Sequence, residues 1–407
     1  MSETGSEHKL QSIVFIDDAH TFGGAQIALA WAIRAVLHRL PQPVLCICTA
    51  TTREAIQQIA GDDEKLRYIE CPPALPLNLF SFPLRLRSFH KLLAPLAREG
   101  VVTWSLNLSG IEFCLAPLFI LRHLKLHPIA WLHNNETFLF YSAKGSPLRR
   151  LASRIRDAIA NRWLFGLYPL IVTPSYATEN SLRTRFHGSR HPRTGFLHPY
   201  VGLQNGASSH RSETCDSAGE KIDLWMIGRV EYSQKNNLAG LEVLKELRMQ
   251  GKSACLTVVG DGVDMAHFRI STQKMGLSEF VHFKGWQQNP WELVPDNAII
   301  LIPSFFESFC LVAREAMLYG AIMVVSPLPV FFEWIPSELI ALNFSAEAFV
   351  NKVEEVSSMS RERMRIFYTE ALQMFTEDAF VAKFESLMQA ATTDERQLPR
   401  SARAGRY

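Results

Sequence analysis

Two glutamates, Glu307 and Glu315, lie on either side of a predicted helix start at about Leu311. An apolar strand is expected over residues 298–303, and a short polar loop follows it. The first turn of a helix carries unpaired backbone N–H groups and the positive end of the helix dipole, which together favour a bound phosphate. One carboxylate precedes this anion site and the other lies one turn into the helix. The arrangement suits a ligand with sugar hydroxyls on both sides of a diphosphate, as in a nucleotide sugar.

The same stretch resembles the signature of family 4 retaining glycosyltransferases, in which two glutamates are separated by seven residues. The resemblance extends to the residues around the Glu307-x7-Glu315 pair, namely Ser308, Phe309, Leu311, Val312, Ala316 and Met317. Cys310 departs from it, because the family usually has glycine there. Only glycine relaxes strained backbone without cost, so Cys310 should either adopt an ordinary conformation or narrow the donor pocket. The competing interpretation is an exposed acidic helix start after a core strand.

Composition limits the classes to which the chain can belong. Its 407 residues predict two domains, and 47% apolar with 20% charged residues is ordinary for a globular α/β protein. The net charge of +2 gives no indication of nucleic-acid binding by the whole chain. The cysteine spacing favours reduced, buried thiols in the cytosol. The seven cysteines are Cys46, Cys48, Cys71, Cys114, Cys215, Cys255 and Cys310.

No signal peptide is evident, since residues 1–9 are polar, and no apolar run reaches the length of a membrane span. We therefore expect a cytoplasmic protein, either soluble or peripheral on the cytoplasmic face of a membrane. Two basic, aromatic-rich stretches, residues 77–98 and 144–163, could lie on anionic lipid and present the active site to a lipid-linked acceptor. Solvated helix faces explain these stretches equally well.

Short β-rich runs alternate with helical stretches along most of the chain, a pattern typical of open parallel sheets. Strands are predicted at 12–16, 44–49, 101–106, 129–133 and 170–173, and again at 222–227, 254–259, 281–283, 298–302 and 322–325. Leucines at intervals of three predict a helix over 236–250, and helices are also predicted over 361–375 and 378–391.

These elements predict two facing Rossmann-like domains, which is the glycosyltransferase-B architecture and agrees with the resemblance. We expect an acceptor-binding domain at 1–202, a linker at 203–221 and a donor-binding domain at 222–375. A terminal helix at 376–391 should pack on the first domain, and a disordered tail should occupy 392–407. Ligands in such sheets lie at the carboxyl ends of the strands.

Cations follow the first strand of the second predicted domain. Gly228 and Arg229 end that strand, and Lys235 comes six residues after the arginine. An arginine can grip phosphate oxygens in a bidentate manner, while a lysine acts as a point charge. The segment resembles the family's Gly-Arg…Lys-Asn stretch, whose cations neutralise the leaving group. A solvated turn is the alternative.

Glycines and an indole end the next strands. Gly260 and Gly262 resemble the family's Gly-x-Gly, which lets the backbone approach the donor, although Gly-Asp-Gly is also an ordinary turn. Trp286 stands where the resemblance implies contacts to the nucleobase, and it could stack on the base or cap the core.

The first predicted domain supplies further candidates. The pair Gly23 and Gly24 resembles the family's N-terminal glycines, whose backbone N–H groups approach the donor phosphate. His133 falls where the family has a histidine near the reacting carbon, and such an imidazole could hydrogen-bond a donor hydroxyl. Ser175 resembles a strand-end hydroxyl that contacts donor or acceptor. Tyr200 replaces an asparagine of the family and is given no role.

The chain contains no Asp-x-Asp pair, and the cations and the helix start can offset the diphosphate charge without a metal. We therefore expect a retaining, metal-independent hexosyltransferase that needs no cofactor beyond its nucleoside-diphosphate sugar, a GDP- or UDP-sugar. The acceptor would be a glycan or lipid-linked oligosaccharide in cell-surface polysaccharide or lipopolysaccharide synthesis. An epimerase or phosphorylase of the same fold, and a degenerate transferase-like binding subunit, remain as alternatives.

Overall fold

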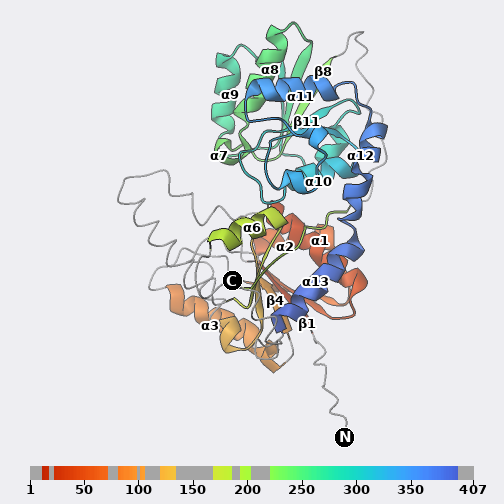
Figure 1. Ribbon diagram of the computed structural model, residues 1–407. Helices are drawn as coiled ribbons and strands as arrows, with labels where there is room; N and C mark the ends of the chain where they lie inside the picture. The colour runs from red at the N-terminus through yellow and green to blue at the C-terminus, as the bar shows by residue number, and fades with distance from the viewer. Residues whose placement is uncertain are drawn as a thin grey trace. The chain divides into compact units, whose positions relative to one another are not determined.

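The computed structural model describes residues 12–17, 23–71, 81–98, 101–105, 120–133, 168–185, 193–202 and 221–392 of the 407-residue chain. The predicted linker, apart from Lys221, lies outside these residues, as do the basic stretch 144–163 and all but the first residue of the predicted tail. The chain divides into two compact units (Figure 1). Unit 1 comprises residues 1–200 and 377–407, and unit 2 comprises residues 201–376.

Unit 1 is built on a seven-stranded sheet in the order β3-β2-β1-β4-β5-β6-β7, and every neighbouring pair is parallel. Two of its strands, β3 and β7, were not predicted, because their half-buried residues do not form an apolar run. The strands are β1 (Ser12–Asp17), β2 (Val44–Cys48), β3 (Leu66–Glu70), β4 (Val101–Ser105), β5 (Pro128–Trp131), β6 (Leu170–Thr173) and β7 (Arg193–Phe196).

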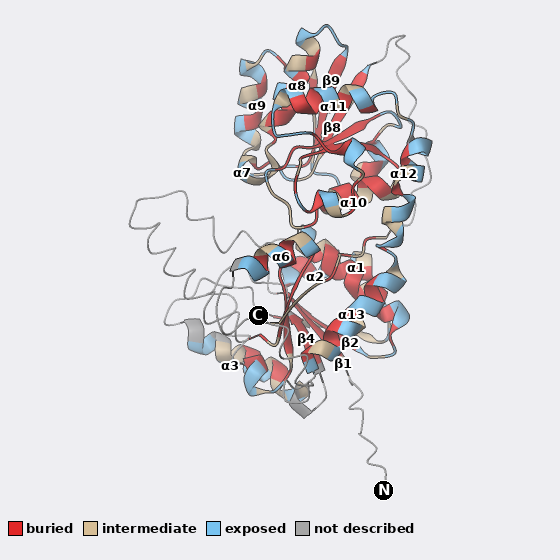
Figure 2. Ribbon diagram, viewed as in Figure 1, coloured by how far each residue is buried: buried red, intermediate tan, exposed pale blue. Residues whose placement is uncertain are grey.

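Helices cover this sheet, and the buried strands lie beneath the exposed outer faces of the helices (Figure 2). The helices described in unit 1 are α1 (Gly24–Arg39), α2 (Ala50–Ala60), α3 (Ser81–Leu93), the 3₁₀ helix η1 (Ala94–Arg98), α6 (Tyr176–Arg185) and α13 (Glu377–Thr392). Among the described parts of the chain, no helix is long and apolar enough to span a membrane.

The last helix, α13, returns to unit 1 and packs on α1, β4, β5 and β6, so that the end of the chain completes the first core. Its Phe384 ring stacks on Trp104 of β4 with centroids 4.5 Å apart. Arg39 of α1 binds Glu377 at 2.9 Å. Both aromatic side chains are fully buried, which identifies the helix as part of the core of unit 1.

Unit 2 is built on a five-stranded parallel sheet in the order β10-β9-β8-β11-β12. Its strands are β8 (Ile222–Ile227), β9 (Ala254–Val259), β10 (Val281–Gly285), β11 (Ile299–Ile302) and β12 (Ile322–Val325). All residues of β9, β11 and β12 are buried, as continuous apolar runs in a sheet covered on both faces should be.

The helices of unit 2 alternate with these strands. They are α7 (Tyr232–Lys235), α8 (Leu238–Met249), α9 (Met265–Lys274), α10 (Leu311–Leu318), α11 (Ala346–Val356) and α12 (Arg361–Gln373), with short 3₁₀ helices η5 (Pro290–Leu293), η6 (Phe331–Glu333) and η7 (Ser337–Leu339). The helix α8 packs on α9, α11 and β9, while α10 packs on α12 and β12.

Candidate functional site

The site candidates of unit 2 gather where the direction of strand order reverses. From β8 the chain adds β9 and β10 on one side and β11 and β12 on the other, so the carboxyl ends of β8 and β11 are neighbours. Gly228 and Arg229 leave the first of these ends, and Pro303 and Ser304 leave the second. In open α/β sheets the reversal point is the usual place for a ligand.

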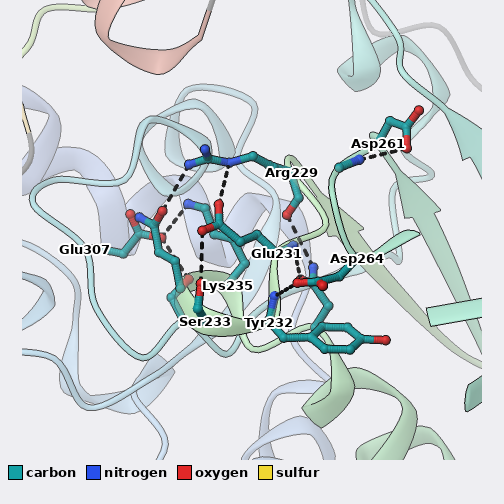
Figure 3. A network of polar contacts seen from close by, with 12 residues as sticks. Arg229, Glu231, Tyr232, Ser233, Lys235, Asp261, Asp264 and Glu307 are labelled. Atoms are coloured by element: carbon teal, nitrogen blue, oxygen red, sulfur yellow. Dashed lines mark hydrogen bonds and ion pairs between the residues drawn. The ribbon is translucent and has the colours of Figure 1, made fainter. Parts of the chain in front are cut away.

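Lys235 and Glu307 form an ion pair at this edge (Figure 3). The Lys235 Nζ lies 2.6 Å from Glu307 Oε1, and the hydroxyl of the buried Ser304 donates to the same oxygen at 2.8 Å. Burial by itself would lower the pKa of Lys235, but the Glu307 carboxylate outweighs it and the pKa is raised. Lys235 is therefore charged, and both of these contacts are made to Glu307 Oε1.

Arg229 is also paired, with a partner that the sequence analysis did not identify. Its Nε lies 3.1 Å from the carboxylate of Glu231, and its Nη2 donates to the Gln234 side chain at 3.0 Å (Figure 3). Glu231 is buried, whereas 56% of the Arg229 side chain is exposed. The guanidinium is held from one side and open to solvent on the other, as a phosphate ligand requires. The sequence signal for this ion pair was the opposite charge of Glu231, two residues after Arg229.

The predicted strand-end glycines prove to be packing positions. A Cβ on Gly260 would lie 1.9 Å from the Gly228 carbonyl oxygen, and one on Gly262 would lie 2.2 Å from the Val230 carbonyl oxygen. The Asp264 carboxylate accepts from the Tyr232 backbone N–H at 2.8 Å and fixes the start of α7 (Figure 3). The glycines therefore allow close contact between the segments that follow β8 and β9.

Cys310 does not adopt an ordinary backbone conformation, which was one of the two expectations for it. Its φ of 78° and ψ of 88° place it in the left-handed region, immediately before α10. Its side chain is buried and lines a pocket with Gly228, Arg229, Lys235 and Ser304. Burial, together with the nearby Glu307 charge, raises the pKa of the thiol to about 12. The thiol is therefore neutral and occupies space that a glycine would leave open.

Glu315 lies in α10, half-buried, and has a partner that sequence reasoning missed. The indole N–H of Trp291, in η5, donates to Glu315 Oε2 at 2.9 Å. The Trp291 ring stacks on Tyr319 with centroids 5.1 Å apart and planes 9° apart. Burial raises the pKa of Glu315 to about 7, although the Trp291 bond and Arg314 oppose that rise. No local pattern links Trp291 to a glutamate 24 residues later.

The other predicted donor contacts of unit 2 lie at the ends of the same loops. Phe309 is buried, with its ring 5.2 Å from that of Trp334, so only its backbone can face a ligand. Ser308 precedes it and is half-buried, and Leu311 begins α10 as expected. Trp286 follows β10 and is 70% exposed, which makes it a surface ring and excludes the core-capping interpretation.

The glycine and histidine candidates of unit 1 follow β1 and β5. Gly23 caps α1, and its N–H donates to the Gln26 side chain at 3.0 Å, so this N–H is already engaged; Gly24 is exposed. His133 is half-buried, with its ring centroid 4.5 Å from that of Trp131. Burial lowers the pKa of His133 to about 3, so the imidazole is neutral near pH 7.

Ser175 caps a helix of unit 1. Its side chain is fully buried, and its hydroxyl oxygen accepts from the Thr178 backbone N–H at 3.2 Å. The Thr178 hydroxyl lies 2.8 Å from the same oxygen. This reciprocal pair caps the first turn of α6, as serine and threonine commonly do. Across the described ranges, no group of three or more histidine, cysteine, aspartate or glutamate side chains could hold a metal ion.

Comparison with known sequences finds similarity in the region that carries the site. Residues 213–372 match the family model "Glycosyl transferases group 1". The lipopolysaccharide 1,6-galactosyltransferase of Escherichia coli K12 is 30% identical over 107 residues, which are 25% of this chain and 29% of that protein. The Salmonella typhimurium LT2 enzyme of the same name is 33% identical over 69 residues, 16% of this chain and 19% of that protein. The chain thus matches less than a third of the length of these curated relatives.

Solved structures match over nearly the whole chain. Anabaena HepE in complex with UDP and glucose has a TM-score of 0.67 at 14% identity, covering 93% of this chain and 99% of that one. WaaG, a glycosyltransferase involved in lipopolysaccharide biosynthesis, has a TM-score of 0.61 at 16% identity, covering 94% and 100%. The chain therefore has the two Rossmann-like domains of the glycosyltransferase-B architecture, with a glycosyl transferases group 1 match over residues 213–372.

Proposed function

We propose that this protein is a retaining, metal-independent glycosyltransferase. It moves a hexose from a nucleoside-diphosphate sugar to a glycan or lipid-linked oligosaccharide in lipopolysaccharide or related cell-surface polysaccharide synthesis. The observation that carries the proposal is the charged cluster at the strand-order reversal of unit 2, where Lys235 and Glu307 pair at 2.6 Å beside the start of α10. The family match and the partial similarity to galactosyltransferases of lipopolysaccharide support it.

Each group has a part in this proposal. Glu315 accepts hydrogen bonds from the ribose hydroxyls, and Glu307 Oε2 accepts from the sugar. Arg229, Lys235 and the N–H groups at the start of α10 stabilise the departing diphosphate. The acceptor oxygen bonds to the anomeric carbon on the face from which the phosphate leaves. The leaving phosphate oxygen takes the acceptor's proton, so no nucleophile of the protein is needed.

Substitution of two site residues tests the assignment. Glu307→Ala and Arg229→Ala should each reduce transfer from the sugar nucleotide by a factor of about 100 or more, measured by release of nucleoside diphosphate. Lys252→Ala serves as control, because Lys252 lies on the surface of unit 2 and pairs there with Glu354. Full activity in both site variants would refute the proposal. The anomeric configuration of the product, read by NMR, tests retention, and activity in EDTA tests metal independence.

Donor base and catalytic competence need separate measurements. A thermal-shift screen with UDP, GDP and their hexose conjugates should single out one base, and UDP is favoured because HepE was solved with it. Slow hydrolysis of the bound donor without acceptor would separate an active transferase from a degenerate binding subunit. Epimerisation of the sugar, or phosphate-dependent cleavage of a glycan, would instead support the alternatives of the same fold.

Association with an anionic membrane surface is a further part of the proposal. The helix α3 buries Phe89 and exposes Arg87, His90 and Lys91, and 67% of Leu84 is exposed beside them. A basic face with an apolar residue suits an interface with anionic lipid. Arg87→Glu with Lys91→Glu should reduce co-sedimentation with phosphatidylglycerol vesicles but not with neutral ones. If variant and wild type sediment equally with the anionic vesicles, α3 does not contribute to membrane binding.

A further inference from the structure

Trp291 is the one aromatic side chain described here that hydrogen-bonds a carboxylate of the proposed nucleotide site. Its Nε1 lies 2.9 Å from Glu315 Oε2. The residue is 7% exposed, so this N–H would be an unpaired buried donor without the glutamate. Water cannot readily replace the glutamate as acceptor at a buried position. The bond is therefore a fixed part of the structure at the edge of the core.

A second contact fixes the plane of the indole. The Trp291 ring stacks on Tyr319, which lies one helical turn after Glu315 and directly follows α10. Residues four apart lie on the same face of a helix, so the indole lies along that face and bridges the two positions. The stack holds the indole plane at 9° to the Tyr319 ring, and within that plane the N–H donates to Glu315.

The hydrogen bond from Trp291 is made to Glu315 Oε2, one of the two carboxylate oxygens. A carboxylate without this donor could rotate about its side-chain torsions, and burial would favour its protonated form. A protonated carboxyl has lost acceptor capacity toward the two hydroxyls of a ribose. We infer that Trp291 is a positioning residue of the nucleotide site, which orients Glu315 and keeps it as an acceptor for the ribose diol. This inference rests on the proposed function, in which Glu315 binds the ribose.

The groups that act on this carboxyl come from two segments. Arg314 and Tyr319 belong to α10 and its end, and Cys310 precedes the helix. Glu292 is next to Trp291 in η5 and acts on Tyr319. The Trp291 bond and Arg314 both favour the ionised form, whereas burial opposes it. Removing the indole N–H therefore shifts ionisation of Glu315 to higher pH.

The test is the affinity for UDP and for GDP as a function of pH. In Trp291→Phe, which keeps an aromatic ring and loses the donor, the pH midpoint of nucleotide binding should rise by about one unit. Affinity should fall about tenfold at pH 6 and less than about twofold at pH 9. Tyr319→Leu keeps the indole and removes the stack. It should lose less affinity than Trp291→Phe, and the loss should again be larger at pH 6 than at pH 9.

Three controls separate positioning from general damage. Trp225→Phe removes another buried indole of unit 2 and should leave the pH profile unchanged. The 2′,3′-dideoxy nucleotides should bind wild type and Trp291→Phe equally. In a Glu315→Gln background, the pH-dependent part of the Trp291→Phe effect should disappear, because no carboxyl remains to titrate.

The outcomes are distinguishable. A loss of affinity that is equal at all pH values, or no loss, overturns the role of Trp291 while the proposed function stands. Failure of wild type to bind either nucleotide refutes the proposed function, and the positioning role with it.

Discussion

The conformation of Cys310 makes a prediction about stability at the residue scale. A side chain with a φ of 78° is strained by about 1–3 kcal/mol unless the residue is glycine. Elsewhere, alanine is more stable than glycine by roughly 0.5–1 kcal/mol. At this position the order should reverse, so that Cys310→Gly is more stable than Cys310→Ala by about 1 kcal/mol in urea unfolding.

Ala316 in the same helix gives the matched comparison for Cys310. It is fully buried in the interior of α10, so Ala316→Gly should cost about 1 kcal/mol. If Cys310→Gly proves less stable than Cys310→Ala by a similar amount, the backbone at 310 is unstrained.

The Lys235–Glu307 pair predicts strong coupling between the two positions. Glu307 is 5% exposed, so removing its cation leaves a buried charge, which typically costs 3–5 kcal/mol. Lys235→Met should therefore destabilise unit 2 by about 3 kcal/mol, and adding Glu307→Gln should restore most of that loss. Additive effects in denaturant titrations would mean that the pair does not interact.

Glu315 should make stability depend on pH. Its folded pKa of about 7 lies above the ordinary value of 4.5, so the fold favours the protonated form. The stabilisation is complete below about pH 4.5 and is lost as pH rises through 7. Compared with wild type, Glu315→Gln should gain free energy of unfolding between pH 5 and pH 8, by up to about 3 kcal/mol. A pH-independent difference in thermal denaturation would contradict the raised pKa.

At the scale of elements, the contact between the ends of β8 and β9 predicts which glycines are essential. Gly260→Ala would bring a methyl group to 1.9 Å from a backbone oxygen, which requires the segments to separate. Gly276 also has a positive φ, of 71°, but no atom lies within 4 Å of its Cβ position. Gly260→Ala should therefore abolish nucleotide binding or folding, whereas Gly276→Ala should cost about 1 kcal/mol. Equal costs would exclude steric packing as the role of Gly260.

Most elements of unit 2 could be predicted from sequence, because its buried parallel strands are continuous apolar runs. The strands at 222–227, 254–259 and 322–325 were predicted with the observed bounds. The edge strand β3 was missed because Arg67, Tyr68 and Glu70 break the apolar pattern. Element boundaries follow local sequence, whereas edge pairing depends on a neighbour far along the chain.

Part of the candidate site could likewise be predicted from local sequence, and part depends on three-dimensional contacts. Arg229, Lys235, Glu307 and Glu315 could be proposed because they follow predicted strands or begin a predicted helix. The Trp291 bond and the helix cap made by Ser175 could not, since each depends on the direction of a side chain in three dimensions. For Cys310 the sequence left open an ordinary conformation or a narrowed donor pocket, and it did not predict the left-handed backbone.

At the scale of the whole molecule, the two units should respond to different perturbations. Phe384 of α13 belongs to the core of unit 1, so Phe384→Ala should destabilise that unit by about 3–5 kcal/mol. If calorimetry resolves two unfolding transitions, Phe384→Ala should lower the midpoint temperature of one. Bound nucleotide should raise the midpoint temperature of the other. Ile366→Ala, at a 73% exposed position of α12, is the control and should change neither by more than about 0.5 kcal/mol. A nucleotide effect on the Phe384-sensitive transition would place binding in unit 1.

The buried Arg314 has a consequence for how this chain can be rearranged. Its guanidinium donates to the carbonyl of Val201 at 3.5 Å and to that of Phe375 at 3.4 Å, and these residues stand at the two ends of unit 2. Unit 2 is thus an insertion whose two ends are linked by the Arg314 side chain. A domain whose two ends lie close together can be inserted into another protein without distorting the structure around the insertion point. We therefore expect unit 2 to tolerate transfer to another host protein as long as Arg314 is kept.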